Sequence, residues 1–172
     1  MKMDRRNGVG SHSTHGAHQP QHARDRSHAE AYTMLSKVSW AVVGDSVEAG
    51  SEASRIARRL RAIGKTVFAV DPNATQEVDE WGDHIAGSSA GAVCSLHDLP
   101  ERVDVVLLAL SPKAGRRYVD EMVQLGVKQL YIQAHVLWGL RAGWEALHTA
   151  NAAGVRAHEA NILTEISGGC AH

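Results

Sequence analysis

A glycine and two serines follow the first apolar run of the sequence with a spacing that suits phosphate binding. The segment reads Gly44-Asp45-Ser46, and Ser51 follows after a second glycine. Glycine lets the backbone approach a phosphate closely, and the free N–H groups at the start of a following helix attract its negative charge. We therefore predict an anion site here, with the serine hydroxyls as donors and any Cβ on Gly44 pointing into the phosphate space. The spacing Gly-x-Ser-x-x-x-Gly is not GxGxxG, so a purely structural turn is the alternative.

An acidic residue, Asp71, closes the second apolar run about 27 residues after Gly44. At the end of the second strand of a dinucleotide-binding fold, an acid usually binds the ribose hydroxyls of NAD and would repel the 2′-phosphate of NADP. Pro72 and Asn73 come next and are expected at the same edge of the sheet. The alternative is that Asp71 only caps its turn.

Two further segments are expected to bring functional groups to the same crevice. Leu110-Ser111-Pro112 follows the most apolar strand, and His135 follows another. His135 is suited to proton transfer because histidine titrates near neutral pH. The cations Arg55 and Lys113 lie early in predicted helices and could reach a phosphate. Charged residues on a helix face are, however, most often simply solvated.

The sequence contains no convincing catalytic set. The motifs HExxH and GxxxxGK are absent. The two cysteines, Cys94 and Cys170, lack the spacing of a disulfide framework or of a structural zinc site. Cys94 is expected to be a small buried hydrophobe. These features favour a binding function over catalysis and predict no metal site.

Alternating apolar runs and amphipathic segments predict the elements that position these groups. The first predicted helix has Ser51 as its N-cap and Gly64 just beyond its end. Strands that alternate with helices form an open, doubly wound parallel sheet, so we predict a Rossmann-like α/β/α domain of three layers. In such sheets ligands bind at the carboxyl ends of the strands. Strands are expected over residues 40–43, 66–70, 103–110, 129–133 and 155–157, with a short one at 92–94.

Residues 1–36 are predicted to be a disordered, His-rich leader, and residues 37–172 to be the domain. The leader holds five of the eleven histidines and almost no branched aliphatic residues, so it cannot bury enough apolar area to offset the entropy lost on ordering. We expect the domain to fold without it. No apolar run reaches the roughly 18 residues that span a bilayer. A cytoplasmic location is expected, with organelle targeting by the leader left open.

Several segments together resemble a known family. They are similar, in order and spacing, to the small CoA-binding domain proteins, relatives of the CoA-binding domain of the succinyl-CoA synthetase α subunit. The resemblance implies coenzyme A held along the carboxyl edge of the sheet, with its adenine end near the second-strand turn. The segments are AVVGDS (41–46), VFAVDPN (67–73), SLHDLPERVDVVLLALSP (95–112), GVKQLYIQ (126–133) and GVRAHEANIL (154–163). The implied contacts are Gly44, Ser46, Asp71, Pro72, Ser111 and Pro112.

Two positions depart from the pattern of that family. Gln133-Ala134-His135 stands where the family often has Gln-x-Gly, so the His135 side chain would narrow the site or add a polar contact. Ile162 stands where relatives carry a cysteine, so no thiol-linked role is expected there. Asn161, immediately before it, completes the set of candidate contacts.

Three functions are consistent with the sequence. The leading hypothesis is binding of CoA or an acyl-CoA by a stand-alone domain without catalysis of its own. The second is an NAD-binding oxidoreductase or redox-sensing module, supported by Asp71. The third is an interaction domain without a ligand. A net charge of −1 argues against nucleic acid as a partner, no membrane association is expected, and a homo-oligomer or a partner protein is left open.

Overall fold

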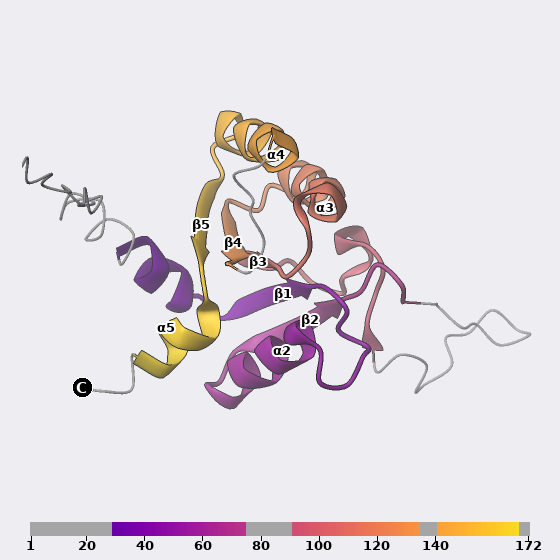
Figure 1. Cartoon of the computed structure of the whole chain (residues 1–172), viewed down its shortest axis with the longest axis vertical. Coiled ribbons are helices and arrows are strands. Elements are labelled where there is room, and N and C mark those ends of the chain that lie inside the picture. Colours follow the sequence, from indigo (N-terminus) through magenta and orange to yellow (C-terminus); the bar gives the residue numbers. More distant parts are fainter. Residues whose placement is uncertain (1–28, 75–90, 135–140, 169–172) are drawn as a thin grey trace, which may run out of the picture.

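Five strands form one sheet in which every neighbouring pair is parallel. The computed structural model describes residues 29–74, 91–134 and 141–168. The strand order is β2-β1-β3-β4-β5, so the chain winds outward from β1 first in one direction and then in the other (Figure 1). This is the doubly wound topology that the sequence predicts. The strands are β1 (Ser39–Val43), β2 (Thr66–Val70), β3 (Val105–Leu108), β4 (Gln129–Gln133) and β5 (Arg156–Ala160).

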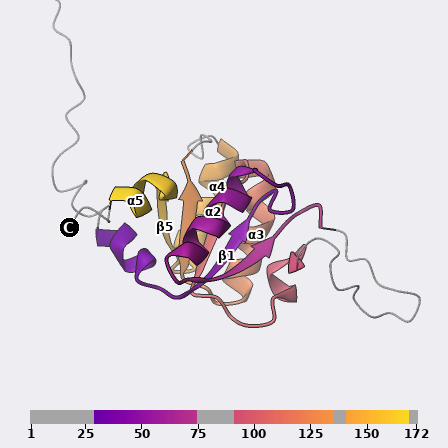
Figure 2. The ribbon, with the colours of Figure 1, turned by 90° about the horizontal axis from the view of Figure 1, so that it is seen from below.

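Helices cover both faces of the sheet. Alternate residues of a strand face opposite sides, so Trp40 and Val42 join the core beneath α2, whereas Ala41 and Val43 join the core beneath α3. Strands buried on both faces account for the continuous apolar runs in the sequence. No helix among the described residues is long and apolar enough to cross a membrane. One face carries α2 (Glu52–Ala62) and α5 (Ile162–Gly168), and the other carries α3 (Pro112–Gln124) and α4 (Arg141–Ala152), as Figures 1 and 2 show.

Short-range signals set the ends of the helices. Ser51 precedes α2, and its hydroxyl accepts a hydrogen bond from the backbone N–H of Ser54 at 3.1 Å. Beyond the other end of α2, Gly64 has a φ of +82°, a left-handed conformation that favours glycine. Gly126 beyond α3 has a φ of +72°. The N-cap and the terminal glycine predicted for α2 are both confirmed.

Several elements differ from the prediction. β3 is shorter than predicted at both ends, and the segment 92–94 contributes a single parallel bridge, between Val93 and Val70. β5 begins one residue later than predicted and extends to Ala160. α5 is absent from the prediction, because a seven-residue helix of mixed composition shows no readable periodicity.

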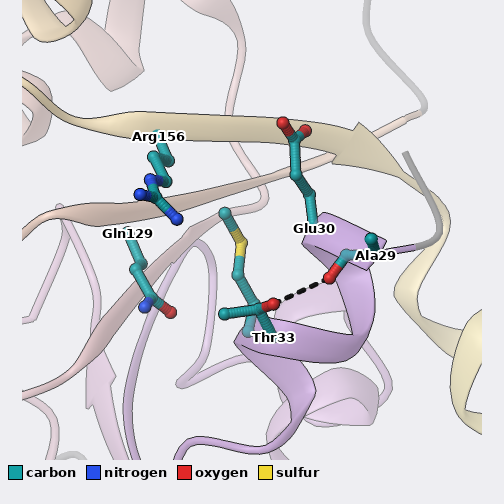
Figure 3. A pocket seen from close by; sticks show the side chains of 6 residues that line it. Ala29, Glu30, Thr33, Gln129 and Arg156 are labelled. Atoms are coloured by element: carbon teal, nitrogen blue, oxygen red, sulfur yellow. Dashed lines mark hydrogen bonds between the residues drawn. The ribbon is translucent and has the colours of Figure 1, made fainter. Parts of the chain in front are cut away.

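Residues 29–35, which their composition assigns to the leader, form a helix in the structure. Ala31 and Met34 on one side of it are buried, and Met34 belongs to the core beneath α2. A cavity of about 170 Å³ lies between this helix and Gln129 and Arg156, the first residues of β4 and β5 (Figure 3). The packed part of the chain therefore begins before residue 37, while residues 1–28 lie outside the described residues.

Candidate functional site

The turns that the sequence marks as candidate sites lie at one edge of the sheet. The register places Val43 level with Val70 on one side and with Leu108 on the other. The segments that follow these three residues therefore leave the sheet at the same level, which is its carboxyl edge. The structure brings together there the turns 44–46, 71–73 and 110–112. His135 lies outside the described residues.

Gly44 sits between the sheet and α2 and is buried. Its N–H donates to the Val70 carbonyl at 2.9 Å. A Cβ on Gly44 would lie 2.8 Å from the Cβ of Ala53 and 3.2 Å from the carbonyl oxygen of Ala109, and its φ is not positive. The expectation that this Cβ would point into a phosphate space is therefore wrong. The glycine instead allows α2 to pack closely on the sheet, which keeps the first turn of α2 near the carboxyl edge.

Ser46 carries a hydroxyl that lacks a partner. Its Oγ is buried and makes no hydrogen bond, although its N–H donates to the Gly44 carbonyl at 2.6 Å. A buried hydroxyl without a partner is uncommon and carries a desolvation cost of about 1–3 kcal/mol. Most of the turn around it is exposed, including Asp45 and residues 47–50. Ser46 is thus the group of this turn with unused capacity to bind a ligand.

Ser51, the second predicted hydroxyl donor, is occupied by structural contacts. Its hydroxyl accepts from Ser54 as the N-cap of α2 and donates to the backbone carbonyl of Asp45. Both hydrogen bonds close the turn onto the start of the helix. Ser51 therefore shapes the turn and leaves Ser46 as its available hydroxyl.

Asp71 joins two of the turns at the carboxyl edge. Its carboxylate accepts from the N–H of Val47 and from the N–H of Asn73, both at 2.9 Å, and the residue is 2% exposed. The first bond fixes the turn after β1, and the second fixes the turn after β2. The geometry matches the turn-cap interpretation, because a ribose could not reach so enclosed a carboxylate. Pro72 and Asn73 remain exposed beside it.

The remaining candidates at this edge mostly begin helices. The Ser111 hydroxyl accepts from Ala114 N at 3.4 Å and caps α3, and Asn161 Oδ1 caps α5 by accepting from Leu163 N at 3.1 Å. Pro112 is the buried first residue of α3, Leu110 is half-buried, and Lys113 is exposed. These residues position the helix starts at the carboxyl edge, and Lys113 is the second residue of α3.

Gln133, at the end of β4, is a buried connector that sequence reasoning did not count among the site residues. Its Nε2 donates to Glu52 Oε1 at 2.8 Å, and its Oε1 accepts from Ile162 N at 3.1 Å. One amide thus ties the first residue of α2 to the first residue of α5. The Gln of the Gln-x-Gly pattern was the sequence feature that could have indicated Gln133. Its two hydrogen-bond partners are distant in sequence, so the pattern does not reveal them.

Arg55, which is expected to reach a phosphate from the start of its helix, lines a groove between α2 and α5. Arg58 and Arg59 line the same groove, whose volume is about 410 Å³. All three side chains belong to exposed residues. The groove is lined on the opposite side by Leu163 and Ser167 of α5.

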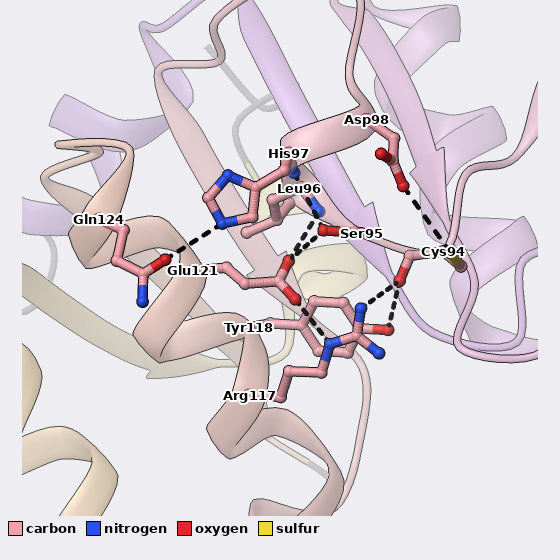
Figure 4. Close-up of polar contacts among 9 residues, drawn as sticks. All are labelled: Cys94, Ser95, Leu96, His97, Asp98, Arg117, Tyr118, Glu121 and Gln124. Carbon is pink, nitrogen blue, oxygen red and sulfur yellow. Dashed lines mark hydrogen bonds and ion pairs between the residues drawn. The ribbon is translucent and has the colours of Figure 1, made fainter.

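A buried network around Glu121 fastens the segment 94–98 to α3 (Figure 4). Glu121 Oε2 accepts from the Ser95 hydroxyl at 2.9 Å and from Leu96 N at 2.8 Å, and its Oε1 accepts from Arg117 Nε at 2.6 Å. The bond to Glu121 raises the pKa of Arg117. The Tyr118 hydroxyl donates to the Cys94 carbonyl at 3.1 Å, and burial raises the pKa of Tyr118. This network is internally satisfied and has a structural role.

A second buried cluster holds α5 against the sheet. Glu165 accepts from the Tyr131 hydroxyl at 2.5 Å and lies 3.0 Å from His158 Nε2. Burial, and then the bond to Glu165, raise the pKa of Tyr131. The histidine is 4% exposed, so a substrate would not reach it. Within the described ranges, no group of three or more His, Cys, Asp or Glu side chains could hold a metal ion.

Residues 87–91 read GSSAG and so match the letters of the serine-nucleophile motif GxSxG. That motif needs a strand immediately before the serine and a helix after it. Here the next described element is the bridge at Val93, which follows the motif, and residues 75–90 lie outside the described residues. The letters alone therefore give no support for a nucleophile.

The five-stranded parallel sheet, covered by helices on both faces, defines a Rossmann-like α/β domain. Residues 38–169 match the family described as "CoA binding domain". The chain belongs to that family, as its sequence motifs suggested.

Several solved structures share this fold. A hypothetical protein from Pyrococcus horikoshii OT3 is 23% identical, with a TM-score of 0.60 over 78% of this chain and 84% of its own. A conserved hypothetical protein from Pyrococcus furiosus is 25% identical, with a TM-score of 0.53 over 71% and 92%. The dinucleotide forming acetyl-coenzyme A synthetase 1 of Ca. Korarchaeum cryptofilum is 22% identical, with a TM-score of 0.52 over 69% of this chain and 25% of the synthetase. No curated protein matches significantly.

Proposed function

We propose that this chain binds coenzyme A, or an acyl-CoA, at the carboxyl edge of its sheet and acts as a binding module without catalysis of its own. Membership of the CoA-binding domain family supports the ligand. The observation that carries the site is the buried Ser46 hydroxyl without a partner. A phosphate oxygen of the ligand would supply the acceptor that this hydroxyl lacks.

The turn after β1 has the features that a diphosphate requires. Gly44 allows α2 to start close to the sheet, and the positive end of the helix dipole favours an anion there. The side chains around Ser46 are exposed, so a small movement of the turn would present its hydroxyl to the ligand. Asp71 fixes the far side of the turn through Val47 N. The exposed Pro72 and Asn73 beside it are where we place the adenine end.

The absence of independent catalysis is inferred from the state of the titratable groups. The buried Glu121 and the half-buried Glu165 each have several partners, and both hold segments of the fold together. The acetyl-CoA synthetase from Ca. Korarchaeum cryptofilum matches this chain over only a quarter of its length. We propose that a reaction of bound CoA would need a further domain or a partner protein.

The decisive experiment is a calorimetric titration and a thermal shift of the full chain with CoA, acetyl-CoA, NAD and ATP in parallel. A ligand at a hundred times its dissociation constant should raise the free energy of unfolding by about 2.7 kcal/mol. We expect this for CoA or acetyl-CoA and not for NAD. A null result with all four would favour an interaction domain. Formation of acyl-CoA from acid, CoA and ATP by the purified chain would contradict the non-catalytic part of the proposal.

A further inference from the structure

The groove between α2 and α5 is a cationic cavity on the α2 face of the sheet. It has a volume of about 410 Å³, in the range typical of sites for small molecules. Its lining combines three guanidinium groups with apolar side chains and one hydroxyl. The lining residues are Arg55, Arg58, Arg59 and Ala62 of α2 and Leu163 and Ser167 of α5.

The arginines of this groove differ from most other arginines of the protein. Within the described part of the chain, the side chains of Arg55, Arg58 and Arg59 make no hydrogen bond or ion pair. Apart from Arg156, every other arginine with a described side chain makes such a contact. Arg61 donates to Val67 O at 2.9 Å, and Arg102 donates to Leu125 O at 2.8 Å. Arg116 forms an ion pair with Glu145, and Arg117 forms one with Glu121. The three unpaired cations therefore converge on one cavity.

The acids of the two helices do not neutralise this cluster. Glu52 of α2 accepts a hydrogen bond from Gln133, and Glu165 of α5 is bonded to Tyr131 and His158. The arginines lie at positions i, i+3 and i+4 of one helix, where like charges repel one another. An anion bound between them would relieve that repulsion.

We propose that this groove binds a small anion carrying two or three phosphate groups, at a site separate from the CoA edge. Arginine suits this ligand because its planar fork of N–H donors matches a phosphate in bidentate geometry. Three forks around one cavity match more than one phosphate, and Leu163 and Ala62 would contact a carbon portion. The proposal does not depend on CoA binding, because it rests on residues of the α2 and α5 faces alone.

The probe is inorganic tripolyphosphate, titrated calorimetrically into the full chain at low salt, since screening weakens such contacts. The chain should bind it with a dissociation constant below about 1 mM. Arg58→Glu with Arg59→Glu should weaken binding at least about tenfold. The same pair changed to lysine should weaken it by about threefold, because the charges remain and the forks are lost. Circular dichroism should show all variants folded, as both positions are exposed.

The control is Arg156→Glu, a single charge reversal at an exposed arginine of β5 outside the groove. It should leave the dissociation constant within about twofold. No binding by the unmodified chain, or equal weakening by Arg156→Glu, would overturn the proposal. In a second arm, saturating CoA should leave tripolyphosphate binding unchanged. Displacement by CoA would show that the phosphates of CoA themselves occupy the groove and would refute a separate site.

Discussion

The network around Glu121, which joins the segment 94–98 to α3, is called the Glu121 junction below. This junction and the turn after β1 differ in how completely their polar groups are satisfied by hydrogen bonds. At the junction, one carboxylate accepts from a hydroxyl, a backbone N–H and a guanidinium (Figure 4). At the turn, Ser51 and Asp71 are equally well bonded, but the Ser46 hydroxyl is buried without a partner. The comparison separates polar groups that hold the fold from the one that is left for a ligand.

The first and largest test of this comparison is Glu121→Ala. The change removes the acceptor of the Ser95 hydroxyl and of Leu96 N, both in the interior, and each unsatisfied donor costs about 1–3 kcal/mol. We expect the free energy of unfolding to fall by about 4 kcal/mol, as measured by urea denaturation, because two buried donors lose their acceptor. Glu121→Gln is the matched control, since it keeps an acceptor oxygen, and it should cost about half as much. A loss under about 1 kcal/mol for Glu121→Ala would show that the junction is not structural.

The second test concerns the helix at residues 29–35. Met34→Ala should lower the free energy of unfolding by about 3 kcal/mol, because the side chain is 2% exposed and its loss leaves a cavity. Tyr32→Ala on the same helix is the control and should have little effect, since Tyr32 is 78% exposed. A chain that starts at residue 37 should be destabilised like Met34→Ala. If the chain that starts at residue 37 melted at the same temperature as the full chain, the helix at residues 29–35 would not contribute to stability.

The third test is Gly44→Val. With a Cβ only 2.8 Å from that of Ala53, α2 must move away from the sheet, and such overpacking costs about 1–3 kcal/mol. We expect about 2 kcal/mol by thermal denaturation. Ala49→Val at an exposed position of the same turn should cost less than about 0.5 kcal/mol. If Gly44→Ala instead abolished CoA binding at unchanged stability, the glycine would be a ligand contact after all.

Much of the fold could be predicted because its signals are local. Ser51 and Gly64 bracket the apolar stripe of α2, and the run 66–70 is a strand from end to end. The helix at residues 29–35 was not predicted, because a composition averaged over 36 residues hides two buried side chains, Ala31 and Met34, that lie three residues apart. α5 was not predicted either, because it is stabilised by tertiary contacts such as the hydrogen bond from the Tyr131 hydroxyl to Glu165.

The candidate site was predictable in place and less so in detail. Parallel strands bring their carboxyl ends to one edge, so the positions of Gly44, Asp71 and Ser111 followed from topology. Their hydrogen-bond partners could not be predicted from topology. Asp71 receives a hydrogen bond from Val47, 24 residues away in the chain, and Gln133 bridges residues more than 100 apart. Such contacts depend on how helices pack, which one sequence does not display.

The last and smallest change is Ser46→Ala, which removes one hydroxyl. Because that hydroxyl is buried without a partner and costs desolvation energy, its removal should raise the free energy of unfolding, by about 1 kcal/mol. CoA affinity should nevertheless fall about ten- to hundredfold, since a hydrogen bond to a charged acceptor contributes about 1.5–3 kcal/mol. Ser51→Ala should mainly affect stability, because it removes the N-cap of α2 and lowers the free energy of unfolding by about 1 kcal/mol. Calorimetric titration with CoA beside urea denaturation of both variants gives the two readouts. If Ser46→Ala binds CoA as tightly as the unmodified chain, the ligand does not lie at this turn, and the unpartnered hydroxyl is only a tolerated defect of packing.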